Sequence, residues 1–344
     1  MWPLVGHNRI TAYLERSLEK DALSHAYLFV GPKHIGKMTL AVILAQAVNC
    51  PAPARPCGEC PSCLKIAANN HPDVQILRLL TADEAEDKKA KSELVIEQVR
   101  GLQHWASLPP YEGRCRVFIF EQAELLNEAA ANCLLKVLEE PLPNVLFILL
   151  APSAGMVPET ISSRCQGLIF RPVPDGEIED MLLGRGFPPD KTPLVVRLAA
   201  GAPGWALTAM EHDEVLVKRV DRLEKFLELV SQSYEERFEA AEEFAGKGAQ
   251  GRNDAIEIVY DWQVLWRDLL IAQIGHIEGI TNIDYSDKIT SLGSKLSLAD
   301  SRAFLGVLVK AEEWVNFNVN PRLIFEMLML EMPLIGQSKT EKVI

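Results

Sequence analysis

The sequence predicts an α/β domain built on a parallel sheet, followed by two domains made only of helices. Short apolar runs rich in β-branched residues recur in the first half of the chain, and segments with helical periodicity separate them. After Phe170 two prolines, Pro172 and Pro174, interrupt the chain, and the later segments have helical spacing. The expected strands are Ala26–Val30, Val74–Leu80, Val117–Phe120, Val145–Ala151 and Gly167–Phe170.

Three domains are expected from these changes of pattern. An α/β domain spans residues 1–171, a lid of short helices spans 172–212, and a helical bundle spans 213–344. The run Asp83–Lys89 lacks apolar spacing and indicates a solvated loop. The expected helices are Met38–Val48 and Leu94–Leu108 in the first domain, Asp175–Leu183, Pro193–Ala199 and Trp205–His212 in the lid, and Val215–Ser231, Tyr234–Ala245, Asp254–Ile274, Ser297–Phe317 and Pro321–Met332 in the bundle.

Composition and charge exclude several classes of protein. Of 344 residues, 48% are hydrophobic and 24% are charged, which excludes a disordered chain. The longest clear apolar run, Val145–Ala151, is far shorter than the ~18 residues of a membrane span. Residues 1–7 lack the basic head and apolar core of a secretory signal, so we expect a cytoplasmic protein. The net charge of −12 disfavours DNA binding by the isolated chain.

A degenerate phosphate loop follows the first expected strand. Gly31, Gly36 and Lys37 have the spacing with which backbone N–H groups and a lysine hold nucleotide phosphates at a helix N-terminus. The residue after the lysine should carry a hydroxyl that binds Mg²⁺, but Met38 stands there and Thr39 is displaced by about 100° around the helix. The loop either binds nucleotide weakly or without turnover, or is a glycine-rich turn with no ligand.

The strand Val117–Phe120 ends without the acidic pair of an ATPase. An ATPase places an aspartate there for the metal and a glutamate that activates water, whereas this chain has Glu121 and Gln122. A neutral amide takes up no proton near neutral pH and cannot act as a general base. ATP hydrolysis by this chain is therefore not expected.

Four cysteines lie close together after the phosphate-loop helix. Cys50, Cys57, Cys60 and Cys63 supply four thiolates with the spacing of a closed, structural zinc site. Unligated cysteines and redox chemistry at a Cys-x-x-Cys pair are the alternatives. The remaining three, expected to be buried small apolar residues, are Cys115, Cys133 and Cys165.

Several motifs together resemble the bacterial clamp-loader subunits of the AAA+ family. The resemblance covers almost the whole chain, and its central motifs are specific to clamp loaders. The segments that carry it are His25–Pro32, the four-cysteine module, Ala131–Pro141, Ser162–Gln166, Gly201–Leu207 and Asn318–Leu323.

The resemblance implies a RecA-like AAA+ domain with a zinc module, a three-helix lid and an all-helical collar that assembles a five-subunit ring. It also implies that Arg164, in the Ser163-Arg164-Cys165 motif, is an arginine finger inserted into the ATP site of a neighbouring motor subunit. The alternative is that Arg164 forms a salt bridge within its own domain. A sensor arginine is usual where this chain has Gly204.

Three functions compete at this stage. The first is a non-hydrolysing clamp-loader subunit that acts with the gamma and tau motor subunits and the delta subunit to load a sliding clamp on primed DNA. The second is an ATP-hydrolysing motor of the gamma/tau type, which Lys37 favours and which Met38 and Gln122 oppose. The third is a zinc-stabilised nucleic-acid adaptor, which the net charge disfavours.

Overall fold

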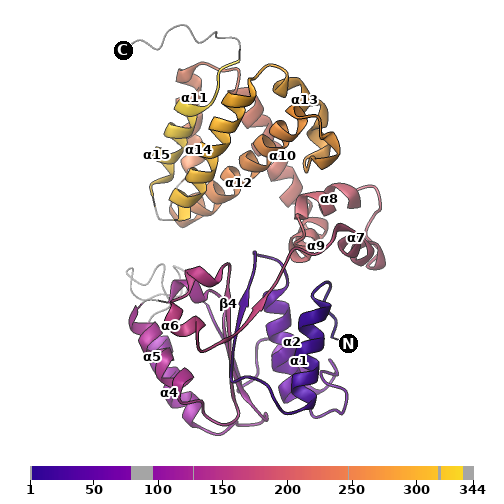
Figure 1. The fold of residues 1–344 in the computed structure, drawn as a ribbon, viewed down its shortest axis with the longest axis vertical. Helices are drawn as coiled ribbons and strands as arrows, with labels where there is room; N and C mark the ends of the chain where they lie inside the picture. The colour runs from indigo at the N-terminus through magenta and orange to yellow at the C-terminus, as the bar shows by residue number, and fades with distance from the viewer. Residues whose placement is uncertain (1, 79–95, 127, 247, 317–318, 336–344) are drawn as a thin grey trace. The chain divides into compact units, whose positions relative to one another are not determined.

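The computed structural model describes residues 2–78, 96–126, 128–246, 248–316 and 319–335. The chain forms two compact units (Figure 1). Unit 1 contains residues 1–184 and 201–205, and unit 2 contains residues 185–200 and 206–344. The expected loop at Asp83–Lys89 lies outside the described residues. The predicted three-domain boundaries stay a prediction.

Unit 1 is built around a five-stranded parallel sheet, as the sequence predicts. The strand order is β2-β3-β4-β1-β5, and β1 pairs with β4 on one side and β5 on the other. All seven residues of the central strand β4 are apolar and buried, because helices cover both faces of a parallel sheet. The strands are β1 Ala26–Val30, β2 Val74–Leu77, β3 Arg116–Phe120, β4 Val145–Ala151 and β5 Gln166–Ile169.

Helices flank this sheet on both faces. In Figure 1, α1 and α2 lie on one side of β4, and α4, α5 and α6 lie on the other. On the latter side, Leu102 of α4 and Leu134 of α5 share a buried cluster with Phe118, Phe147 and Leu149 of the strands. The helices of unit 1 are α1 Asn8–Glu19, α2 Lys37–Asn49, α3 Pro61–Ala67, α4 Ile96–Ser107, α5 Glu128–Glu139, α6 Glu159–Ser162 and α7 Asp175–Gly184, with 3-10 turns η1 Ala123–Leu125 and η2 Ala154–Met156.

The three scattered cysteines differ slightly from the expectation. Cys115, Cys133 and Cys165 are half-buried, not fully buried. Cys133 and Cys165 pack at the margin of the core beside α5 and the sheet. Burial still raises the pKa of Cys115 and Cys165 to about 12, so both stay neutral thiols, as expected for small apolar residues.

Unit 2 is a helical bundle with an aromatic core. Trp262 and Trp266 of the long helix α12 are buried against Phe226, Phe304 and Phe325. The predicted helices are present, and α13 is an addition that the sequence did not predict. The helices are α8 Thr192–Ala199, α10 Asp213–Leu229, α11 Tyr234–Ala245, α12 Gly248–Gln273, α13 Ser286–Gly293, α14 Leu298–Asn316 and α15 Pro321–Glu331, with 3-10 turns η3 Ile277–Gly279 and η4 Ile283–Tyr285; α9 Pro203–Glu211 begins in unit 1 and ends in unit 2.

A buried arginine ties three helices of this bundle together. Arg237 of α11 has no exposed surface, and its guanidinium donates five hydrogen bonds to backbone carbonyls of described residues. These carbonyls lie where α10 and α15 end, so the cation meets the negative ends of two helix dipoles. The five acceptors are the carbonyls of Leu229 (2.9 Å), Val230 (3.0 Å), Met329 (3.3 Å), Met332 (2.8 Å) and Pro333 (3.1 Å).

None of the helices in the described ranges combines the length and apolarity required to cross a bilayer.

Candidate functional site

The phosphate loop lies between β1 and α2, at the edge of the sheet where the parallel strands end. Gly31 approaches Phe170 so closely that a Cβ there would lie 2.8 Å from the Phe170 Cβ. Gly36, the N-cap of α2, has φ +104°, a left-handed conformation that glycine adopts without strain. The two glycines of the motif are therefore required by the geometry of the turn.

Neighbouring groups hold this loop from three sides. The Lys37 Nζ donates hydrogen bonds to the carbonyls of Gly31 and, at 2.6 Å, Pro32. The His7 Nε2 lies 3.0 Å from the Ile35 carbonyl. These contacts attach the loop to its own lysine and to the N-terminal segment.

The third attachment comes from the start of α9. The Gly204 N–H donates to the His34 carbonyl at 2.9 Å, and a Cβ on Gly204 would lie 2.8 Å from that oxygen. A side chain at position 204 would therefore collide with the loop backbone. Gly204 thus holds the backbone of the phosphate loop at His34.

Glu124, which the sequence analysis did not identify as a site residue, interacts electrostatically with Lys37. Burial lowers the pKa of Lys37 to about 8, and the charge of Glu124 partly opposes this. Burial raises the pKa of Glu124, and its buried Oε2 has no hydrogen-bond partner among the described residues. Its place in the sequence, two residues after Gln122 and close to the end of β3, could have indicated that Glu124 belongs to the site.

The residues expected to replace the ATPase ligands lie at the start of α2 and at the end of β3. Met38 is half-buried in the first turn of α2, and Thr39 is exposed on the next position. Glu121 is exposed and Gln122 is half-buried at the end of β3. Neither a thioether nor an amide supplies the missing metal-binding hydroxyl or general base.

Arg164 lies at a different place on unit 1, directly after α6. Its side chain is 37% exposed, and its Nη2 lies 2.6 Å from the Glu139 Oε1. Its Nη1 donates to the Thr160 carbonyl at 2.9 Å and lies 3.4 Å from the Ser163 Oγ. The salt bridge within the domain, which is the alternative role of Arg164, is thus present. A pair this exposed typically contributes about 0–1 kcal/mol to stability.

The four-cysteine cluster is brought together as the sequence predicts. The four sulfur atoms of Cys50, Cys57, Cys60 and Cys63 lie within 4.8 Å of one another and could hold a metal ion. Cys50 and Cys57 Sγ are 3.6 Å apart, and Cys50 and Cys60 Sγ are 3.9 Å apart. A disulfide requires about 2.05 Å, whereas tetrahedral Zn–S bonds of about 2.3 Å separate sulfurs by about 3.8 Å. The cluster has the dimensions of a tetrahedral thiolate site.

Backbone N–H groups favour a thiolate at Cys57, whereas burial raises the pKa of the Cys63 thiol to about 12. Cys60 is the N-cap of α3, and the Cys63 N–H donates to its sulfur at 3.4 Å. The Cys60 N–H donates to the Cys57 Sγ, and such backbone hydrogen bonds lower the pKa of Cys57 to about 6. The Trp2 indole N–H donates to the Arg55 carbonyl, and the Gln46 amide donates to the Cys63 carbonyl. The N-terminal segment and α2 thereby anchor the module.

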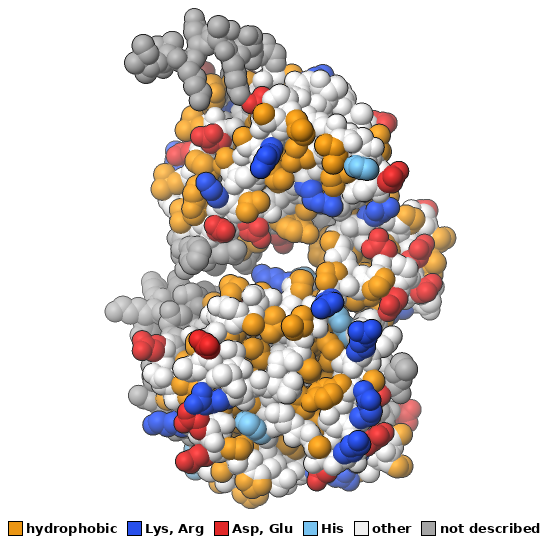
Figure 2. Space-filling view, viewed as in Figure 1, with side chains coloured by type: hydrophobic (Ala, Val, Ile, Leu, Met, Phe, Trp, Pro, Cys, Tyr) orange, Lys and Arg blue, Asp and Glu red, His pale blue; other side chains and the backbone are white. Residues whose placement is uncertain are grey.

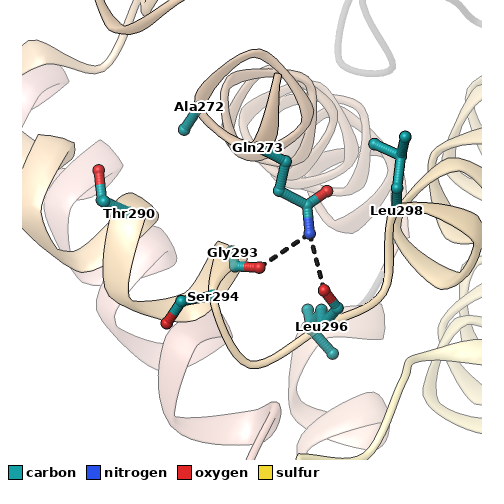
Figure 3. A pocket seen from close by; sticks show the side chains of 7 residues that line it. All are labelled: Ala272, Gln273, Thr290, Gly293, Ser294, Leu296 and Leu298. Atoms are coloured by element: carbon teal, nitrogen blue, oxygen red, sulfur yellow. Dashed lines mark hydrogen bonds between the residues drawn. The ribbon is translucent and has the colours of Figure 1, made fainter. Parts of the chain in front are cut away.

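A surface pocket in unit 2 has a different character. It lies between the end of α12, α13 and the start of α14, where the Gln273 amide donates to the carbonyls of Gly293 and Leu296 (Figure 3). Its lining side chains are neutral, with Thr290 and Leu298 among them. The pocket therefore lacks the ionisable groups of a catalytic or metal site.

A family profile described as "DNA polymerase III, delta subunit" matches residues 6–174. DNA polymerase III subunit delta' of Bacillus subtilis is 31% identical over 94% of this chain and 94% of its own length. The delta' subunit of Pseudomonas aeruginosa is 31% identical over 90% of this chain and 91% of its own length.

Two further comparisons concern gamma-type subunits. The gamma/tau subunit of Mycobacterium tuberculosis is 33% identical, but over only 61% of this chain and 36% of its own length. The match to a solved gamma subunit-related protein of Thermotoga maritima covers 92% of this chain and 97% of that one, with 15% identity and a TM-score of 0.43. Both delta' relatives match this chain along nearly their full length. The chain therefore belongs to the delta' family of DNA polymerase III clamp-loader subunits.

Proposed function

We propose that this chain is a non-hydrolysing subunit of the clamp loader that offers Arg164 to the nucleotide site of a neighbouring motor subunit. The observation that carries the proposal is the combination of an exposed arginine in a Ser-Arg-Cys motif with a phosphate loop that lacks catalytic ligands. A guanidinium fork stabilises the charge that develops on a transferring phosphoryl group. An arginine on the surface of unit 1 is accessible to such a partner.

The phosphate loop supports the absence of hydrolysis. Met38 stands where a motor subunit needs a metal-binding hydroxyl, and Gln122 stands where it needs a general base. In addition, His7 and Gly204 hold two carbonyls of the loop in place. The Lys37 ammonium donates to two other loop carbonyls, and a nucleotide would have to draw the lysine away from them. Tight ATP binding by Gly31, Gly36, Lys37 and Thr39 is accordingly disfavoured.

The proposed partners follow from the family. The chain would complete a five-subunit ring with gamma/tau motor subunits and a delta subunit, the lid at 172–212 and the collar at 213–344 supporting assembly. The ring would place a sliding clamp on primed DNA. On the visible face of each unit, acidic and basic side chains are interspersed (Figure 2), and the net charge is −12. Most of the DNA contact is therefore assigned to the partners.

An ATP-hydrolysing motor of the gamma/tau type is the second candidate, favoured by the 33% identity to a gamma/tau subunit and by Lys37. ATP turnover by the isolated chain distinguishes the two. We expect no turnover above background from the chain alone, and DNA-stimulated turnover when it is combined with the motor and delta subunits. Turnover by the isolated chain that Lys37→Ala abolishes would establish the motor and refute the proposal.

We further propose that the four cysteines hold a structural zinc ion. Four sulfur ligands at tetrahedral spacing leave no open coordination position, which is typical of structural and not catalytic zinc. A bound zinc would link the end of α2, the loop that follows it and the first turn of α3. The ion would supply no chemistry to the clamp-loading reaction.

Cys57→Ser is expected to lose the metal. A serine hydroxyl is a poor zinc ligand, so the zinc content should fall from about one ion per chain to nearly none, and the thermal stability of unit 1 should fall with it. Elemental analysis of the purified variant measures this, and Cys133→Ser, which alters a thiol outside the cluster, should keep its zinc. Full zinc retention in Cys57→Ser would refute the four-thiolate site.

A further inference from the structure

The partner of Arg164 is an unusual residue for its position. Glu139 is the last residue of α5, and its carboxylate lies at the negative end of the helix dipole. That position favours basic side chains, and Lys136 occupies the same turn. A glutamate at position 139 therefore does not stabilise the helix. The positive charge that balances the Glu139 carboxylate comes from Arg164, whose Nη2 lies 2.6 Å from the Glu139 Oε1.

The pair also joins two separate elements. Glu139 ends α5, while Arg164 follows α6, and 25 positions of sequence separate them. The remaining contacts of the guanidinium are local, because Thr160 and Ser163 belong to α6 and its C-cap. Among the hydrogen bonds of Arg164 to described residues, the one to Glu139 joins the arginine to another part of unit 1.

We propose that Glu139 is a positioning residue that orders the Arg164 guanidinium for use by the neighbouring nucleotide site, an inference that rests on the function proposed above. A free arginine side chain has many rotamers, and ordering it costs free energy when it enters an active site. Contacts from three residues hold the guanidinium before any partner binds. The carboxylate occupies only one edge of the fork, and the arginine keeps further N–H groups for a phosphate oxygen.

The expected effect is small and specific, because the pair is half-exposed. With side chains 37% and 50% exposed, the contact should change the maximal rate by about two- to five-fold, the range of exposed ion pairs. Loss of the arginine itself should cost about a hundred-fold or more. The small loss of rate expected without Glu139 can thus be distinguished from the large loss expected without Arg164.

The test uses DNA-stimulated ATP hydrolysis by the assembled clamp loader. Glu139→Ala should lower kcat by about two- to five-fold and leave KM for ATP unchanged, because ATP is bound by the motor subunit. Glu139→Gln, whose amide oxygen still accepts a hydrogen bond, should recover part of the rate. Glu140→Ala removes the neighbouring exposed carboxylate and should behave as wild type.

A double variant decides whether Glu139 acts through the arginine. In an Arg164→Ala background, Glu139→Ala should have no further effect. A further loss there, an unchanged kcat, or a raised kcat in the single variant would overturn the positioning role while the function proposed for Arg164 stands. If Arg164→Ala leaves turnover unchanged, the proposed function itself fails.

Discussion

Arg164→Ala is expected to lower DNA-stimulated ATP hydrolysis by the assembled clamp loader about a hundred-fold or more, while the chain still folds and assembles. The reason is that alanine removes a cation that would stabilise charge on the transferring phosphoryl group. In the isolated chain the residue contributes only an exposed ion pair, so folding should barely change. Steady-state turnover and the thermal unfolding temperature measure the two effects separately.

Two further variants sharpen this prediction. Arg164→Lys keeps the charge but lacks the planar fork, and we expect it to restore little of the rate. Arg171→Ala removes another exposed arginine of the same unit and should leave turnover unchanged. Wild-type turnover in a ring that carries Arg164→Ala would refute the arginine finger.

The largest effect on stability is expected for Arg237→Met, with a loss on the order of 3–5 kcal/mol in the free energy of unfolding. Methionine fills much of the same volume but donates no hydrogen bonds. Five carbonyls around the ends of α10 and α15 would lose their donor in a buried environment. Urea denaturation followed by tryptophan fluorescence measures this loss, because Trp262 and Trp266 lie in the core of unit 2. Trp2 and Trp105 of unit 1 contribute to the same signal and should keep their transition in the variant.

Arg322→Met is the matched control for this change. Arg322 lies on α15 and pairs with Glu242 and Glu326, but its side chain is 52% exposed. Its loss should cost at most about 1 kcal/mol. Equal losses from the two variants would show that the buried hydrogen bonds of Arg237 do not hold the helix ends.

The sheet could be predicted from the sequence because its signal is local. A run such as Val145–Ala151, apolar at every position, fits only a strand covered on both faces, and the structure confirms it as β4. The long helices of unit 2 were equally predictable from their periodicity. Helix α13 was missed because it is short and its apolar residues, such as Ile289, face a core assembled from distant helices.

The candidate site also has features that the sequence predicts and features that depend on tertiary packing. The cysteine spacing by itself specified the cluster, since all four residues lie within a short stretch of chain. The orphan oxygen of Glu124 could not be foreseen, because its burial depends on packing around the end of β3. The contacts of Gly204 with His34 and of Glu139 with Arg164 were equally hidden, since each joins segments far apart in the sequence.

The sequence alone therefore determined the parallel sheet, the helical second half and the cysteine cluster, because periodicity, spacing and residue chemistry are properties of neighbouring residues. Only the tertiary structure decided that α9 pins the phosphate loop, that Arg237 joins two helix ends and that Glu139 holds Arg164. Those contacts depend on how segments tens of residues apart are brought within hydrogen-bonding distance, and burial and packing of the whole unit determine that.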